Sequence, residues 1–162
     1  MILIDTNVLI YAIQADAPHH EASRRLIEAA QSGNPLACLF PQVLLEFFAV
    51  VTDPQRLAAP ASSDEGRDLV RRYSSLFPVL HPAPSAFDIL ISLVSKFGVR
   101  SQHIFDCHLV AQMMAAGIDT ICTYNTKDFG GYPIATRTAD DLLRAIDVST
   151  PPIIHEKARR AP

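Results

Sequence analysis

The chain has 162 residues, of which 49% are hydrophobic and 19% charged, and its mean hydropathy is +0.16. This length fits one domain with enough buried surface for a core, and the composition excludes a disordered tail and a coiled coil. The net charge of −3 does not by itself indicate a nucleic-acid binder, although a local patch or a bound metal can supply a positive field.

Short apolar runs predict buried strands along the whole chain. We expect them over 1–4, 36–40, 78–80, 120–123 and 134–135, the last as an edge strand. Helical periodicity predicts helices between them, over 8–14, 19–31, 41–51, 62–76, 85–97, 103–116 and 139–146. The predicted domain is 1–147, and 148–162, with a Pro-Pro pair and a basic end, is predicted to be a surface tail.

Local signals mark where several of these helices begin and end. Pro41 suits the first turn of a helix, and Ser62 and Glu65 have the spacing of a capping box. Gly98 suits the end of the helix before it.

Strands that alternate with helices predict a single α/β domain with a central, mainly parallel sheet of four or five short strands flanked by helices. In such folds ligands bind at the carboxyl ends of the strands. Asp5 ends the first strand, and Asn125 and Asp128 follow the strand at 120–123. Polar side chains are therefore expected to meet at this edge.

Three carboxylates lie in apolar surroundings. Glu46 is inside 43–51, Asp106 is inside 104–110, and Asp5 follows an apolar strand. Burying an unpaired carboxylate costs several kcal/mol, and carboxylates that meet also repel one another. A divalent cation removes both penalties, and oxygen ligands suit Mg²⁺ or Mn²⁺.

Each acid also has an ordinary structural explanation. Asp5 can cap the helix that follows it, and Glu46 can pair with an arginine of another helix, such as Arg71 or Arg72. Asp106 can complement a helix dipole, and Asp128 can simply be solvated in its loop. Together these explanations require four coincidences at one end of a sheet, so a metal site is favoured.

Histidines and cysteines do not indicate a zinc site. The cysteines Cys38, Cys107 and Cys122 are odd in number, lack C-x-x-C spacing and sit among apolar residues, as core cysteines do in a reducing compartment. His103 and His108 flank Asp106, but His108 is about 200° from it around a helix, so packing or surface roles are expected for both.

Four sequence blocks together resemble the PIN-domain ribonucleases, most of all the VapC-type toxins of bacterial toxin–antitoxin pairs. The blocks are IDTNVL at 4–9, LLEF at 44–47, IFDCHLVA at 104–111 and TYNTKDF at 123–129. One such block alone is weak, but four in this order are specific. The resemblance covers residues 1 to about 135.

The resemblance implies an endoribonuclease that depends on Mg²⁺ or Mn²⁺. It implies that Asp5 and Asp106 bind the metal directly and that Glu46 is a third acidic residue of the catalytic, metal-binding site. For the fourth catalytic and metal-binding position we favour Asp128 on charge, with Asn125 as the alternative. Whether one or two ions bind stays open.

Supporting residues follow from the same blocks. Asn7 matches a polar residue beside the site, and the hydroxyls of Thr6 and Thr123 are expected to orient the acids. Arg100 and Lys127 are the candidate RNA contacts, because they are the basic residues nearest the later acids in the sequence.

The resemblance also implies partners: an RNA substrate of open identity, a small cognate antitoxin that blocks the site, and a second copy in a homodimer. The apolar N-terminus lacks a basic region and a cleavage site, so we expect no signal peptide and a cytoplasmic location.

The alternative functions are a PIN-like nuclease of RNA processing, a metal-dependent phosphatase and a receiver-like module. Asn7 stands where an aspartyl phosphatase needs a second Asp, and a receiver needs adjacent acids after the first strand.

Overall fold

The computed structural model describes residues 1–149, and these contain a four-stranded parallel sheet with the order β2-β1-β3-β4. Apolar side chains of the central strands are buried, as predicted for strands covered on both faces. Leu3 pairs with Cys38 on one side and with Ile121 on the other. The strands are β1 (Ile2–Ile4), β2 (Ala37–Cys38), β3 (Thr120–Cys122) and β4 (Ala135–Arg137).

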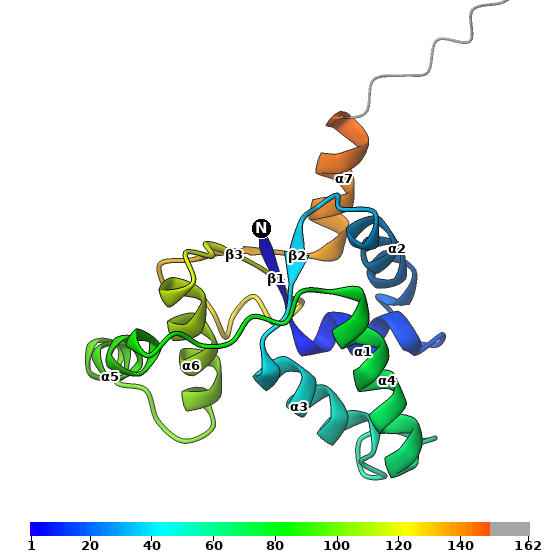
Figure 1. Ribbon diagram of the computed structural model, residues 1–162, viewed down its shortest axis with the longest axis horizontal. Coiled ribbons are helices and arrows are strands. Elements are labelled where there is room, and N and C mark those ends of the chain that lie inside the picture. Colours follow the sequence, from blue (N-terminus) through cyan, green and yellow to red (C-terminus); the bar gives the residue numbers. More distant parts are fainter. Residues whose placement is uncertain (150–162) are drawn as a thin grey trace, which may run out of the picture.

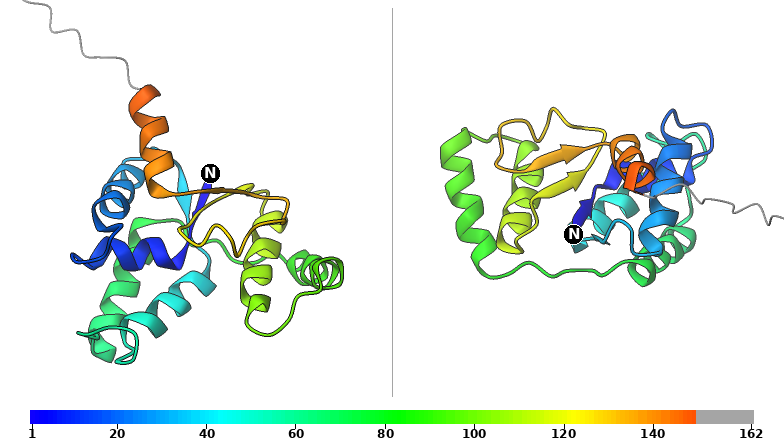
Figure 2. Two further views of the ribbon diagram at one scale, coloured as in Figure 1. Left: turned by 180° about the vertical axis from the view of Figure 1, so that it is seen from behind. Right: turned by 90° about the horizontal axis from the view of Figure 1, so that it is seen from above.

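Helices connect the strands and cover both faces of the sheet. Those in the described residues are α1 (Thr6–Ile13), α2 (His20–Gln31), α3 (Pro41–Val51), α4 (Ser63–Leu76), α5 (Ser85–Phe97), α6 (His103–Ala115) and α7 (Ala139–Ser149). Helices α5 and α6 pack together on one side, and α1 to α4 lie on the other, as Figure 1 and the view from above in Figure 2 show. Helix α7 packs on α2. The predicted α/β class is confirmed.

The predicted helix ends are confirmed by their local geometry. Pro41 stands in the first turn of α3. Ser62 and Glu65 form a complete capping box at α4, and Gly98 ends α5 with a left-handed φ of 62°.

Other expectations differ from the structure. Helix α1 begins at Thr6 rather than at Val8, because Asp5 caps it from the end of β1. The segment 78–80 is not a strand, since Val79 forms only an isolated bridge with Leu39.

Of the predicted surface tail, the residues from 150 onward lie outside the described part of the chain, and 148–149 belong to α7. No helix within residues 1–149 is long and apolar enough to cross a bilayer.

Helix α3 is held between α1 and α4, which fixes it next to the end of β1. A glycine allows α4 to approach closely. A Cβ atom on Gly66 would lie 2.8 Å from Cγ2 of Thr52 and 3.0 Å from Cε2 of Phe48. The hydroxyl of Thr52 donates to the carbonyl of Phe48, so this side chain is not free to rotate away.

We therefore expect Gly66→Ala to lower the free energy of unfolding by about 1–2 kcal/mol, because overpacking outweighs the gain of up to about 1 kcal/mol in helix propensity. Chemical denaturation measures the change. Arg71→Ala, an exposed site on the same helix, is the matched control and should stay within about 0.5 kcal/mol of the wild type. A Gly66→Ala protein as stable as this control would contradict the packing argument.

Candidate active site

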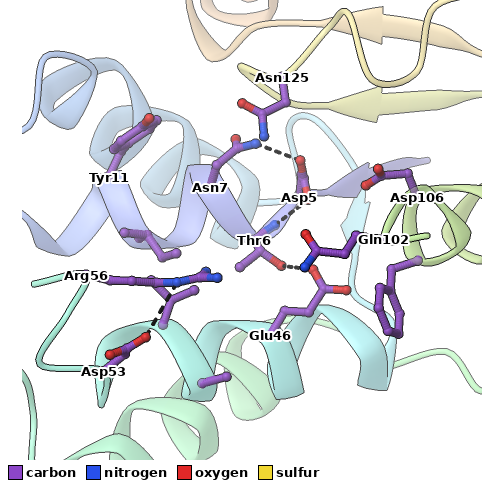
Figure 3. A pocket seen from close by; sticks show the side chains of 14 residues that line it. Asp5, Thr6, Asn7, Tyr11, Glu46, Asp53, Arg56, Gln102, Asp106 and Asn125 are labelled. Carbon is purple, nitrogen blue, oxygen red and sulfur yellow. Dashed lines mark hydrogen bonds and ion pairs between the residues drawn. The ribbon is translucent and has the colours of Figure 1, made fainter. Parts of the chain in front are cut away.

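Three carboxylates from distant parts of the sequence line one pocket at the carboxyl edge of the sheet (Figure 3). Asp5 follows β1 and caps α1, Glu46 lies in the middle of α3, and Asp106 is in the first turn of α6. Helices α1 and α6 begin on this edge, so the topology itself brings the acids together. The pocket has a volume of about 720 Å³.

Asp5 is the most firmly held of the acids and is only 7% exposed. Its Oδ1 accepts a hydrogen bond from the backbone N–H of Thr6 at 2.7 Å. Its Oδ2 accepts from the hydroxyl of Thr123 at 2.6 Å and from the amide of Asn7 at 2.7 Å. Asp5 is thus both a helix cap and a pocket residue, and capping does not compete with the functional interpretation.

The loop after β3 is tied to the start of α1 through Asn7 and Thr123. The side-chain oxygen of Asn7 accepts from the backbone N–H of Tyr124 at 3.1 Å, and its amide donates to the hydroxyl of Thr123 at 2.9 Å. That hydroxyl also accepts from the backbone N–H of Asn125 at 3.0 Å. These bonds place Asn125 on the pocket wall.

Glu46 is half-buried and has polar partners rather than a cationic one. Its carboxylate accepts from the hydroxyl of Thr6 at 3.3 Å and from the amide of Gln42 at 2.8 Å. The same amide of Gln42 donates to the backbone carbonyl of Phe105 at 2.9 Å. The alternative explanation, an ion pair with Arg71, does not describe Glu46 in the structure.

Gln42 connects α3 to α6, and sequence reasoning missed it. Its side-chain oxygen lies 2.8 Å from Nδ1 of His108 and accepts from the amide of Gln112 at 2.8 Å. His108 therefore contributes to a polar network behind Glu46, where only packing or a surface role was expected. The available signal was a polar residue four positions before Glu46 on one helix face, a spacing that solvated helix surfaces share.

Burial and mutual repulsion make Asp5 and Asp106 hard to ionise. Burial raises the pKa of Asp5 from 3.8 to about 6, and the charges of Glu46 and Asp106 add to this, although the hydrogen bonds from its neighbours oppose it. Burial also raises the pKa of Asp106 to about 6, with the charges of Asp128 and Glu46 next. The nearest basic partner of Asp106 is the exposed His103, with 3.9 Å between Nδ1 and Oδ2.

The remaining predicted residues are placed differently. Asn125 lines the pocket, whereas Asp128 is exposed beside it and acts on Asp106 through its charge. Arg100 and Lys127 are exposed and do not line the pocket. The basic residue that does line it is Arg56, in the loop after α3. Sequence reasoning missed Arg56, because a lone arginine in a polar loop carries no local signal.

The pocket offers carboxylate oxygens, which are the kind of donor atom that Mg²⁺ prefers. No group of three or more His, Cys, Asp or Glu side chains in residues 1–149 is arranged to hold a metal by itself. Mg²⁺, however, keeps several waters and commonly takes only one or two carboxylates from a protein. Asp5 and Asp106 are the carboxylates that could hold such an ion, because a cation would offset the burial and repulsion that raise their pKa values.

Solved structures with this fold include toxins and their complexes. The structure of VapC20 from Mycobacterium tuberculosis, described as a Sarcin-Ricin loop cleaving toxin, has a TM-score of 0.62 and 16% identity, covering 83% of this chain and 97% of that one. The VapBC2 structure from Rickettsia felis, bound to a promoter DNA fragment, has a TM-score of 0.63 and 16% identity, covering 85% of this chain and 98% of that one. At this identity they establish the fold.

Sequence comparison identifies relatives along most of the chain. Ribonuclease VapC48 of Mycobacterium tuberculosis is 28% identical over 127 residues, which are 77% of this chain and 87% of the relative. Ribonuclease VapC24 of the same organism is 26% identical over 132 residues, 80% of this chain and 89% of the relative. The family model described as PIN domain matches residues 2–132, so the chain belongs to the PIN-domain family.

Proposed function

We propose that this protein is a divalent-metal-dependent endoribonuclease that hydrolyses RNA phosphodiester bonds, and that it is the toxin of a type II toxin–antitoxin pair. The main support for this proposal is that Asp5, Glu46 and Asp106 line one pocket. Among the described residues, none of the three forms an ion pair with a Lys or Arg. The kinship to VapC ribonucleases supports RNA as the substrate.

In this proposal Asp5 and Asp106 hold Mg²⁺ or Mn²⁺. A bound ion would supply Lewis-acid chemistry, which lowers the pKa of a water and neutralises charge on a reacting phosphate. Thr123 and Thr6 orient the Asp5 carboxylate. Glu46, oriented by Gln42, accepts at a carboxylate oxygen the proton that the attacking water loses. These acids repel a phosphate when no cation is present, so activity requires the metal.

The fourth acidic position involves the loop after β3. Asn125 faces the pocket and is proposed as a polar contact there. Asp128 is retained as the fourth acid, because its charge acts on Asp106.

The proposed partners follow the relatives. Structural neighbours include a toxin–antitoxin complex from Klebsiella pneumoniae, with a TM-score of 0.59, and a VapBC structure bound to DNA from Salmonella typhimurium. These complexes support a small antitoxin as a partner, and we propose that it covers the pocket. We also propose a homodimer and a cytoplasmic location. The relatives favour this role over RNA processing outside a toxin pair.

Asp5→Asn and Asp106→Asn should each lower cleavage of single-stranded RNA by at least about 100-fold, because each removes a metal ligand while Asn preserves the shape of the side chain. Cleavage of end-labelled RNA with Mg²⁺, with and without EDTA, measures this. In cells without the antitoxin, the wild type should arrest growth and Asp5→Asn should not.

Asp88→Asn is the control for these variants, since Asp88 is exposed on α5 and does not line the pocket. It should cleave RNA like the wild type. Full cleavage in EDTA, or by Asp5→Asn, would refute the catalytic assignment.

The raised pKa values predict that stabilisation by Mg²⁺ depends on pH. In the metal-free protein the folded-state pKa of Asp5, about 6, is above its ordinary value of 3.8, so its contribution to stability is present below pH 3.8 and is lost as the pH rises through about 6. Mg²⁺ binds the ionised form, so it should raise the melting temperature clearly at neutral pH and little at pH values well below about 6.

Thermal unfolding with and without MgCl₂ across this range measures the effect, with Asp5→Asn as the variant that should lose it. An equal Mg²⁺-induced shift at acidic and neutral pH would contradict the linkage.

Gln42→Ala should lower RNA cleavage by about 10-fold, because it removes the side chain that orients Glu46 and joins α3 to α6. Steady-state kinetics measures this, and circular dichroism checks that the protein is folded. Gln31→Ala, an exposed glutamine at the end of α2, is the control and should match the wild type. Wild-type kinetics for Gln42→Ala would show that the network does not position Glu46.

A further inference from the structure

The pocket extends well beyond the three acids. Its volume of about 720 Å³ lies within the range of about 300–1,000 Å³ that is common for ligand sites, and it exceeds what an ion and one phosphate occupy. In Figure 3 the acids line one end, while Tyr11, Asp53 and Arg56 line the other. The mechanism proposed above uses nothing at this second end, which we call the Arg56 end.

Arg56 is the one Lys or Arg among the described residues that line the pocket. Its Nε lies 3.6 Å from a carboxylate oxygen of Asp53, and Figure 3 shows its guanidinium directed toward the acids. The other oxygen of Asp53 accepts from the backbone N–H of Gln55 at 2.8 Å, which fixes the loop. The side chain of Arg56 is 64% exposed, and its terminal nitrogens have no hydrogen-bond partner among the described residues.

Tyr11 presents an aromatic ring to the same end of the pocket. Two other rings support it, with centroid distances of 5.4 Å to His19 and 5.5 Å to Tyr124. His19 stacks on Tyr124 at 3.9 Å. Tyr124 directly follows Thr123, whose hydroxyl donates a hydrogen bond to Asp5. The three rings are therefore connected through the backbone to a residue that holds the Asp5 carboxylate.

These features complement single-stranded RNA. The pocket is otherwise acidic, so a phosphate that does not react needs a cation, and a guanidinium can bind a phosphate through two parallel hydrogen bonds. Unpaired bases stack on aromatic side chains, whereas bases in a duplex are not free to do so.

We propose that the Arg56 end is a nucleotide-binding subsite for single-stranded RNA, in which Arg56 binds the phosphate next to the scissile one and the ring of Tyr11 stacks with a base. This inference rests on the proposed ribonuclease function and adds two substrate-binding residues to it.

The test measures binding of a fluorescein-labelled single-stranded RNA to the full chain carrying Asp5→Asn, at several salt concentrations. Adding Arg56→Ala should weaken binding by about tenfold and lower the slope of log affinity against log salt by about 1, as expected for one lost phosphate contact. Arg56→Lys should keep most of the salt slope. In the otherwise wild-type enzyme, Arg56→Ala should raise KM and leave kcat nearly unchanged.

Arg144→Ala is the matched control. Arg144 also pairs with an aspartate three positions before it, at 2.7 Å from Asp141, and is 74% exposed, but it lies on α7 and does not line the pocket. Its removal should change neither RNA affinity nor the salt slope.

The aromatic half of the subsite has its own test. Tyr11→Phe keeps the ring and should bind RNA like the parent chain, whereas Tyr11→Ala should weaken binding by about tenfold. If Tyr11→Ala does not fold, Tyr11→Leu fills much of the same space without an aromatic face and makes the same comparison. Equal RNA affinity for Tyr11→Leu and Tyr11→Phe would overturn the stacking role.

Two negative results are distinguishable. If the wild type cleaves RNA but Arg56→Ala leaves affinity, salt slope and KM unchanged, the subsite is wrong and the ribonuclease stands. If the wild type neither binds nor cleaves single-stranded RNA with Mg²⁺, the proposed function is wrong and the subsite with it.

Discussion

The buried carboxylate of Asp5 joins the fold to the pocket. It stands where β1 ends and α1 begins, and it accepts hydrogen bonds from neighbours in the sequence and from Thr123, 118 positions away. One of its oxygens satisfies the start of a helix and the other connects two adjacent strands. A side chain held from both directions has little freedom, which suits a group that must meet a ligand in one geometry.

This arrangement conflicts with stability, and a bound cation would relieve the conflict. The chain brings three acids to one pocket, and burial together with repulsion raises the pKa values of Asp5 and Asp106. Functional sites commonly contain buried charges of this kind, because the charges that destabilise the free protein also bind the ligand. Arg56 at the other end gives the same pocket a positive side chain. The pocket therefore has two chemically different ends, one that carries the carboxylates of Asp5, Glu46 and Asp106 and one that carries the guanidinium of Arg56.

Local interactions explain why much of the fold could be predicted. Pro41 favours a helix start through its fixed φ and missing N–H, and Ser62 starts a helix through hydrogen bonds to Glu65. Gly98 ends a helix through its own backbone angle. The parallel sheet follows from apolar runs that alternate with helices. The segment 78–80 shows the limit, because an apolar tripeptide becomes a strand only where a neighbour offers a full edge, and Leu39 offers one bridge.

The sequence by itself determined the order of the elements and which acids were out of place, because an ionisable side chain in an apolar run is visible without coordinates. Only the tertiary structure decided what surrounds them. Gln42 and Arg56 look like ordinary surface residues along the chain, and their roles depend on which helices pack side by side. Asn125 rather than Asp128 lines the pocket for the same reason: the direction of the loop depends on a bond from the Tyr124 backbone to Asn7 in the distant helix α1, together with the local bond from the Asn125 backbone to Thr123.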